Sequence, residues 1–176
     1  MTPSISDRID SLIHTLTDVV LPAIDAEKSL ERDQAQLVIA HLKLIRTQLP
    51  QAAIFDELEL AAAIALGRKL LTLCEGGPKL TQAAKALQDV LASPDPADRQ
   101  DAIRRVNAAN EYLVRASRID GKPASVQAIR TAALANGKAQ TLRDRIFFAD
   151  SGFDADRGDL PDMATYFMEQ ARNGQR

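Results

Sequence analysis

The sequence contains one cysteine, Cys74, no tryptophan, and only 4% aromatic residues. A lone cysteine excludes a disulfide within the chain and any metal site built from several thiolates. With so few aromatic rings, the interior has to be built from aliphatic side chains and alanine, which suits closely approaching helices. These absences favour a helical protein from a compartment where thiols stay reduced, and we expect a cytoplasmic location.

Neither sign of charge dominates, since the chain has 22 basic and 24 acidic residues and a formal net charge of −2. The two signs are mixed along the chain, so no extended positive field steers the protein onto phosphate backbones. No apolar run reaches the roughly 18 residues that a membrane span requires. Asp7 and Asp10 interrupt the first apolar stretch, unlike a secretory signal. We therefore expect a protein that binds neither nucleic acid nor membrane.

Apolar residues make up 45% of the 176 residues, which is typical of a globular chain of one domain. They recur at intervals of three and four residues, the signature of buried helical faces. The pattern predicts helices over about 4–21, 25–49, 51–73, 80–92, 96–118 and 123–148, with a last amphipathic turn or two after Pro161. Ser4 with Asp7 predicts a capping pair for the first helix, and Pro22 is expected to end or kink it near Val20. Asp95 is the predicted cap of the fifth helix, with Pro96 at its first position and the Asp98 carboxylate near its start. The breakers between them are short, so we predict an all-α antiparallel bundle of about six or seven helices, a single domain over residues 1–176.

Two predicted helices carry polar side chains inside their apolar stripes. On a helical wheel, Gln34 and His41 fall near the centre of one stripe, and Asn110 falls at the centre of another with Asn107 at its margin. The first stripe consists of large aliphatic residues: Leu30, Leu37, Val38 and Ile45. Buried polar groups need hydrogen-bond partners. The four residues therefore either fix the helix register or line a ligand pocket.

The sequence contains no complete motif for catalysis, for metal binding or for cofactor binding. The Glu-x-x-His spacing of di-iron bundles is absent. A loop starting at Asp154 resembles a calcium loop only in composition, because its fifth position is Gly158 and its twelfth is Thr165. The Gly76–Lys79 turn could hold an anion at a helix start, but it lacks the glycine spacing of a phosphate loop. We expect no metal, no cofactor and, on balance, no enzyme.

Aromatic residues are concentrated near the C-terminus, where four of the five phenylalanines lie. Residues 150–176 read as a loop followed by a short amphipathic helix. Side chains of this kind are enriched in protein interfaces, and they also close intramolecular cores. If the segment contacts a partner, the contact residues are expected to be Phe153, Met163, Tyr166 and Phe167.

The leading functional hypothesis is a non-catalytic helical interaction or accessory protein of the cytoplasm, with a second copy or another protein as partner. It is reached by elimination of catalytic constellations. The alternative is a small-molecule-binding helical bundle, such as an enzyme subunit, with a polar inner pocket around His41.

Overall fold

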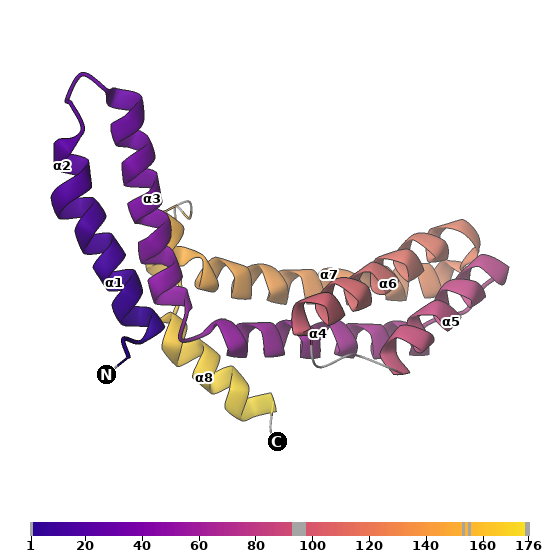
Figure 1. The fold of residues 1–176 in the computed structure, drawn as a ribbon. Coiled ribbons are helices and arrows are strands. Elements are labelled where there is room, and N and C mark those ends of the chain that lie inside the picture. The colour runs from indigo at the N-terminus through magenta and orange to yellow at the C-terminus, as the bar shows by residue number, and fades with distance from the viewer. Residues whose placement is uncertain (1, 93–97, 153, 155, 175–176) are drawn as a thin grey trace. The chain divides into compact units, whose positions relative to one another are not determined.

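The structure is a computed structural model that describes residues 2–92, 98–152, 154 and 156–174 (Figure 1). Over these residues the chain is helical apart from its loops and one isolated bridge between Gly76 and Gly121. The first three labelled helical segments are continuous, so seven helical rods are present in the described part of the chain. The predicted all-α class and the predicted number of helices are confirmed.

The contacts of the chain fall into two compact units, which are described separately. The first unit contains Met1–Ala52 and Arg145–Tyr166. The second unit contains Ala53–Asp144 and Phe167–Arg176.

The first unit begins with α1 (Ile5–Thr15), the π-helical turn η1 (Leu16–Val20) and α2 (Leu21–Ala23). Ser4 caps α1 as predicted: its hydroxyl accepts a hydrogen bond from the N–H of Asp7, whose carboxylate accepts one from the N–H of Ser4.

Pro22 was predicted to end or kink the first helix near Val20, and the helix continues to Ala23 through the π-helical turn η1. Pro22 lacks an N–H group, and the N–H of Leu21 bonds to the carbonyl of Leu16, five residues earlier. The missing hydrogen bond is thus accommodated by a wider π turn and does not end the helix.

Helix α3 (Ser29–Gln48) returns antiparallel to α1, and the two form a helical hairpin (Figure 1). At the loop end, the Arg32 guanidinium donates to the carbonyls of Leu21 and Ile24, at 3.4 and 3.0 Å. At the other end, which we call the open end, Arg46 Nε donates to Asp10 Oδ1 at 3.0 Å. Contacts at both ends fix the direction of the two helices.

The first unit also contains the last residues of α7 and the 3-10 turns η2 (Ala149–Ser151) and η3 (Arg157–Asp159). Gln48 Nε2 donates to the carbonyl of Phe147 at 2.9 Å and so ties the end of α3 to this segment. Arg145 binds the Asp154 carboxylate through two hydrogen bonds, at 2.7 and 3.0 Å.

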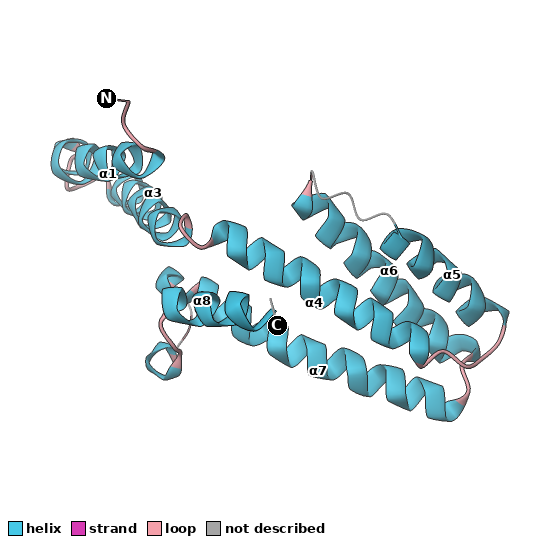
Figure 2. Cartoon of the chain, turned by 90° about the horizontal axis from the view of Figure 1, so that it is seen from below, coloured by secondary structure: helices cyan, strands magenta, loops and turns pink. Residues whose placement is uncertain are grey.

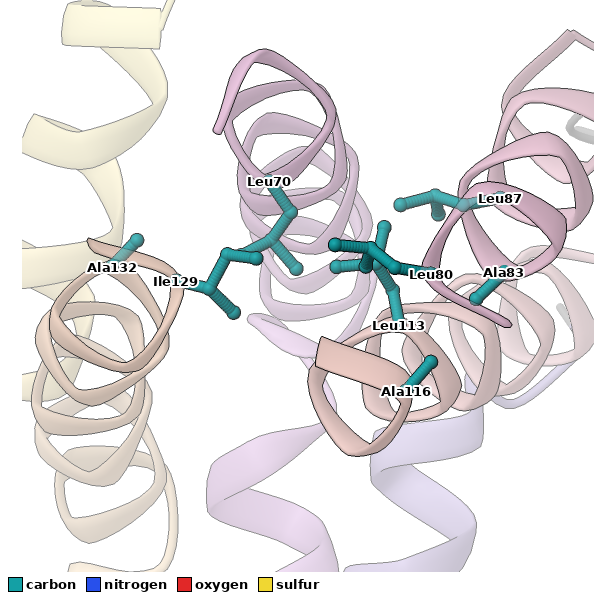
Figure 3. Packing of buried hydrophobic residues seen from close by; sticks show 8 residues of the cluster. All are labelled: Leu70, Leu80, Ala83, Leu87, Leu113, Ala116, Ile129 and Ala132. Carbon is teal, nitrogen blue, oxygen red and sulfur yellow. The ribbon is translucent and has the colours of Figure 1, made fainter. Parts of the chain in front are cut away.

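The second unit is a bundle of α4 (Ala52–Thr72), α5 (Pro78–Ala92), α6 (Arg99–Asp120) and α7 (Pro123–Phe147), with residues of α8 (Met163–Gly174) (Figure 2). Its core consists of small and aliphatic side chains, as the scarcity of aromatics indicated (Figure 3): Leu70, Leu80, Ala83, Leu87, Leu113, Ala116, Ile129 and Ala132. Helix α7 runs unbroken through Asn136 and Gly137.

Two loops pair at one end of this bundle. The N–H of Gly77 donates to the carbonyl of Asp120 at 2.9 Å, and the N–H of Lys122 donates to the carbonyl of Glu75 at 2.8 Å. A Cβ atom on Gly76 would lie 2.7 Å from the Asp120 carbonyl oxygen, so only glycine allows this approach. Because the loops leaving α4 and α6 meet here, α4 to α7 alternate in direction.

At the same end of the bundle, Asp120 occupies the possible anion site of the Gly76–Lys79 turn. Asp120 accepts hydrogen bonds from the N–H groups of Lys79 and Leu80, at 2.7 and 3.0 Å. Its carboxylate therefore occupies the anion position at the start of α5. The start of α6 differs from the prediction: Asp98, expected as a carboxylate in the first turn, is the cap itself and accepts a hydrogen bond from the N–H of Asp101 at 2.9 Å. Asp95 and Pro96, the predicted cap and first helical residue, lie outside the described residues.

Candidate functional site

The polar residues singled out in the sequence lie on two helices of different units. Gln34 and His41 are on α3, and Asn107 and Asn110 are on α6. Gln34 and His41 are exposed, so the expectation that they point inward is corrected. His41 Nδ1 lies 3.0 Å from the carbonyl oxygen of Leu37 in its own helix. Ligand binding by these four residues stays a prediction.

The reason for this orientation is that α3 has two apolar rows. The row that packs within the hairpin contains one fully covered residue, Ile39, and several partly buried ones: Arg32, Ala35, Leu42, Arg46 and Leu49. The other row, which the sequence predicted to be buried, points to solvent. Leu30, Leu37, Val38 and Ile45 are all exposed.

Helix α1 and η1 repeat this arrangement. Ile9 is buried, whereas Ile5 and Leu12, seven residues apart, are exposed together with Val19 and Val20. We call the outward residues of both helices the hairpin face, and each of them is between 39% and 67% exposed: Ile5, Leu12, Val19, Val20, Leu30, Leu37, Val38 and Ile45.

Part of each row lies on one side of the hairpin. At about 100° per residue, Val38 and Ile45 are displaced from Ile39 by roughly 100 to 120°, and Ile5 and Leu12 are displaced from Ile9 by roughly 40 to 60° in the same rotational sense. Because α1 and α3 run antiparallel, equal senses bring these four residues to the same side of the hairpin. Leu30 and Leu37 are displaced from Ile39 by roughly 160 to 180°, so they lie on the part of α3 that is turned away from α1.

Covering these exposed apolar side chains with a partner is favourable by a large free energy. Burying the exposed half of each aliphatic side chain is worth roughly 1 kcal/mol, so eight of them together are worth roughly 6 to 12 kcal/mol before the costs of association. Large contiguous apolar patches are uncommon on monomers and mark binding surfaces. The seven-residue spacing of Leu30 with Leu37, and of Val38 with Ile45, is the pattern of a helix that packs on another helix.

Asn110 has a structural role inside the second unit. It is buried, and its Nδ2 donates to the carbonyl of Ala63 on α4 at 2.9 Å. Its Oδ1 has no hydrogen-bond partner among the described residues and lies where a Cβ on Gly67 would approach to 2.9 Å. This contact joins α4 to α6 and supports the view that the asparagine fixes helix register. Asn107 is partly buried on the same helix.

A buried ion pair that no local sequence pattern indicated lies between α4 and α7. Arg143 Nε donates to Glu59 Oε1 at 2.5 Å, and the two side chains are 11% and 8% exposed. Asp144 follows Arg143 in the chain. Burial raises the pKa of Asp144, the negative charge of Glu59 raises it further, and the positive charge of Arg143 opposes both effects. The cluster thus holds two carboxylates and one guanidinium.

Asp144→Asn is expected to stabilise the protein at neutral pH. Because the pKa of Asp144 is raised on folding, its charged form costs stability, and this cost is present above the folded pKa and absent below the usual value of 3.8. The variant should melt roughly 1 to 3 °C higher than the wild type at pH 7. The difference should vanish near pH 3.5, which thermal unfolding followed by circular dichroism at both pH values would show. A gain that is equal at both pH values would contradict this assignment.

The predicted C-terminal contact residues are in different environments. Phe167 is fully buried and packs edge-on against Phe55, with ring centroids 5.8 Å apart. Met163 and Tyr166 are partly buried, and Phe153 lies outside the described residues. The burial of Phe167 supports the alternative in which this segment closes a core. Interface roles for Met163, Tyr166 and Phe167 stay predictions.

The aspartates of the C-terminal loop are engaged in local structure. A hydrogen bond from Arg145 lowers the pKa of Asp154, and hydrogen bonds from Thr165 lower that of Asp162, which caps α8. Within the described ranges, no group of three His, Cys, Asp or Glu side chains is arranged to hold a metal ion. Burial raises the pKa of the Cys74 thiol, whose sulfur donates to the carbonyl of Leu70.

Comparisons with protein-family models, curated proteins and solved structures gave no match to this chain. Among the described helices, none has the length and apolar composition needed to cross a bilayer. The hairpin face is therefore the feature of this structure that points most directly to a function.

Proposed function

We propose that this protein is a non-catalytic helical interaction protein that binds another protein through the hairpin face. The observation that carries the proposal is the set of eight large aliphatic side chains that are exposed on the two helices of one hairpin, α1 with η1 and α3. Their helical spacing favours a helical partner. The single thiol of Cys74 and the mixed charge support a cytoplasmic setting.

The small-molecule alternative receives less support from this geometry. Its pocket was expected around His41, and both His41 and Gln34 are exposed on the outside of the hairpin. Asn110, the third member of that set, bonds to the backbone of α4. A polar pair on an exposed apolar face suits a protein contact better than an enclosed ligand site.

The proposal can be tested with a photo-crosslinking amino acid, benzoylphenylalanine, in the full chain. Placed at Leu37, in the middle of the hairpin face, it should give one defined protein–protein product that mass spectrometry can identify. Leu134 is a matched control, since it is an exposed leucine on α7 in the second unit. Absence of any product at Leu37, or equal products at both positions, would contradict an interaction role for this face.

A further inference from the structure

The outward positions of α3 are symmetric about the bond between Leu37 and Val38. Moving outward from that bond, the positions form three pairs at equal distances: Leu37 with Val38, Gln34 with His41, and Leu30 with Ile45. A helix that packs antiparallel on its own copy across a two-fold axis brings such pairs into contact. The chemistry of the pairs also matches, because apolar residues oppose apolar residues and polar opposes polar.

We propose that the hairpin face is covered by a second copy of this chain, with α3 antiparallel to α3 of the other copy and the two-fold axis near Leu37 and Val38. This inference rests on the proposed function and names its partner. Ile5 and Leu12 of α1 lie on the same side of the hairpin as Val38 and Ile45 and border this contact. The product is a four-helix arrangement made from two hairpins.

The polar pair gains partners in this arrangement. His41 Nδ1 lies 3.0 Å from the Leu37 carbonyl oxygen, which only accepts hydrogen bonds. In the neutral imidazole this contact favours the tautomer with the hydrogen on Nδ1, which leaves Nε2 as an acceptor. The side-chain amide of Gln34 in the second copy can donate to that nitrogen. Two such bonds, one on each side of the axis, would fix the register within an otherwise apolar contact.

Charge favours the same orientation. The loop end of the hairpin carries five acidic residues, Asp18, Asp25, Glu27, Glu31 and Asp33, against Lys28 and Arg32. The open end carries three basic residues, Arg8, Lys43 and Arg46, against Asp7 and Asp10. An antiparallel α3 pair places the loop end of one copy over the open end of the other. The opposite two-fold arrangement would stack the two acidic loop ends and cost free energy.

The register can be tested by cross-linking single cysteines in the full chain with Cys74→Ser as parent, once that parent sediments like the wild type. Leu30 and Ile45 are about 22 Å apart along one helix, at 1.5 Å per residue. A mixture of Leu30→Cys and Ile45→Cys proteins should be joined by a short bismaleimide, whereas neither protein alone should be. A matched control mixes Leu30→Cys with Leu134→Cys, which should not link.

Dimerisation itself is tested with Leu37→Glu, which places two carboxylates beside the two-fold axis. The dimer dissociation constant measured by sedimentation should rise at least about 100-fold, and Leu134→Glu should leave it unchanged. Links formed by Leu30→Cys alone, or a wild type that stays monomeric, would overturn this inference. If the photo-crosslink at Leu37 then identifies a different protein, the proposed function stands; if it identifies none, both fail.

Discussion

Arg143→Met is expected to lower the free energy of unfolding by about 3–5 kcal/mol, because it leaves a carboxylate buried without its counter-ion. The effect should exceed that of Glu59→Leu. Removing Arg143 leaves both Glu59 and Asp144 without a positive neighbour, whereas removing Glu59 leaves Arg143 beside Asp144. Urea unfolding of both variants would measure the difference.

Two comparisons isolate the contribution of the Glu59–Arg143 pair to the free energy of unfolding. The double variant Glu59→Leu with Arg143→Met should recover most of the loss, since two apolar side chains replace two charges. Arg115→Met should change stability by less than about 1 kcal/mol, because its pair with Glu111 has the same 2.5 Å distance but is exposed. A double variant as unstable as Arg143→Met would contradict this account.

Phe167→Ala is expected to cost about 3–5 kcal/mol, the usual range for a fully buried aromatic ring. The variant loses the edge-on contact with Phe55 and leaves a cavity in the second unit. Met168→Ala is the control on the same helix, since Met168 is exposed. Thermal unfolding of both variants decides between the two roles considered for this segment. A folded, unchanged Phe167→Ala protein that has lost association would instead make Phe167 an interface residue.

Helix positions could be predicted from the sequence because their signals are local. The Ser4 cap and the Gly76–Pro78 break both act within a few residues. The first helix runs two residues beyond the predicted position 21, because a π turn accommodates the proline, and whether such a turn forms depends on the surrounding packing.

The candidate site could be predicted only in part. The stripe around Gln34 and His41 is visible in the sequence, but amphipathic spacing says which side of a helix is apolar and not what covers it. Here the chain covers the row of α3 that contains Ile39 and leaves the row that contains Leu37 exposed. The pair of Glu59 with Arg143 could not be predicted, since 84 residues separate them and no short motif links them.

The most direct test of the central claim is sedimentation equilibrium of the full-length wild type over micromolar to submillimolar concentrations. The account predicts a reversible dimer of twice the 19.1 kDa chain mass, and a shift toward monomer in Leu37→Glu but not in Leu134→Glu. A wild-type mass of 19.1 kDa at every concentration, or dimers unaffected by Leu37→Glu, would contradict it.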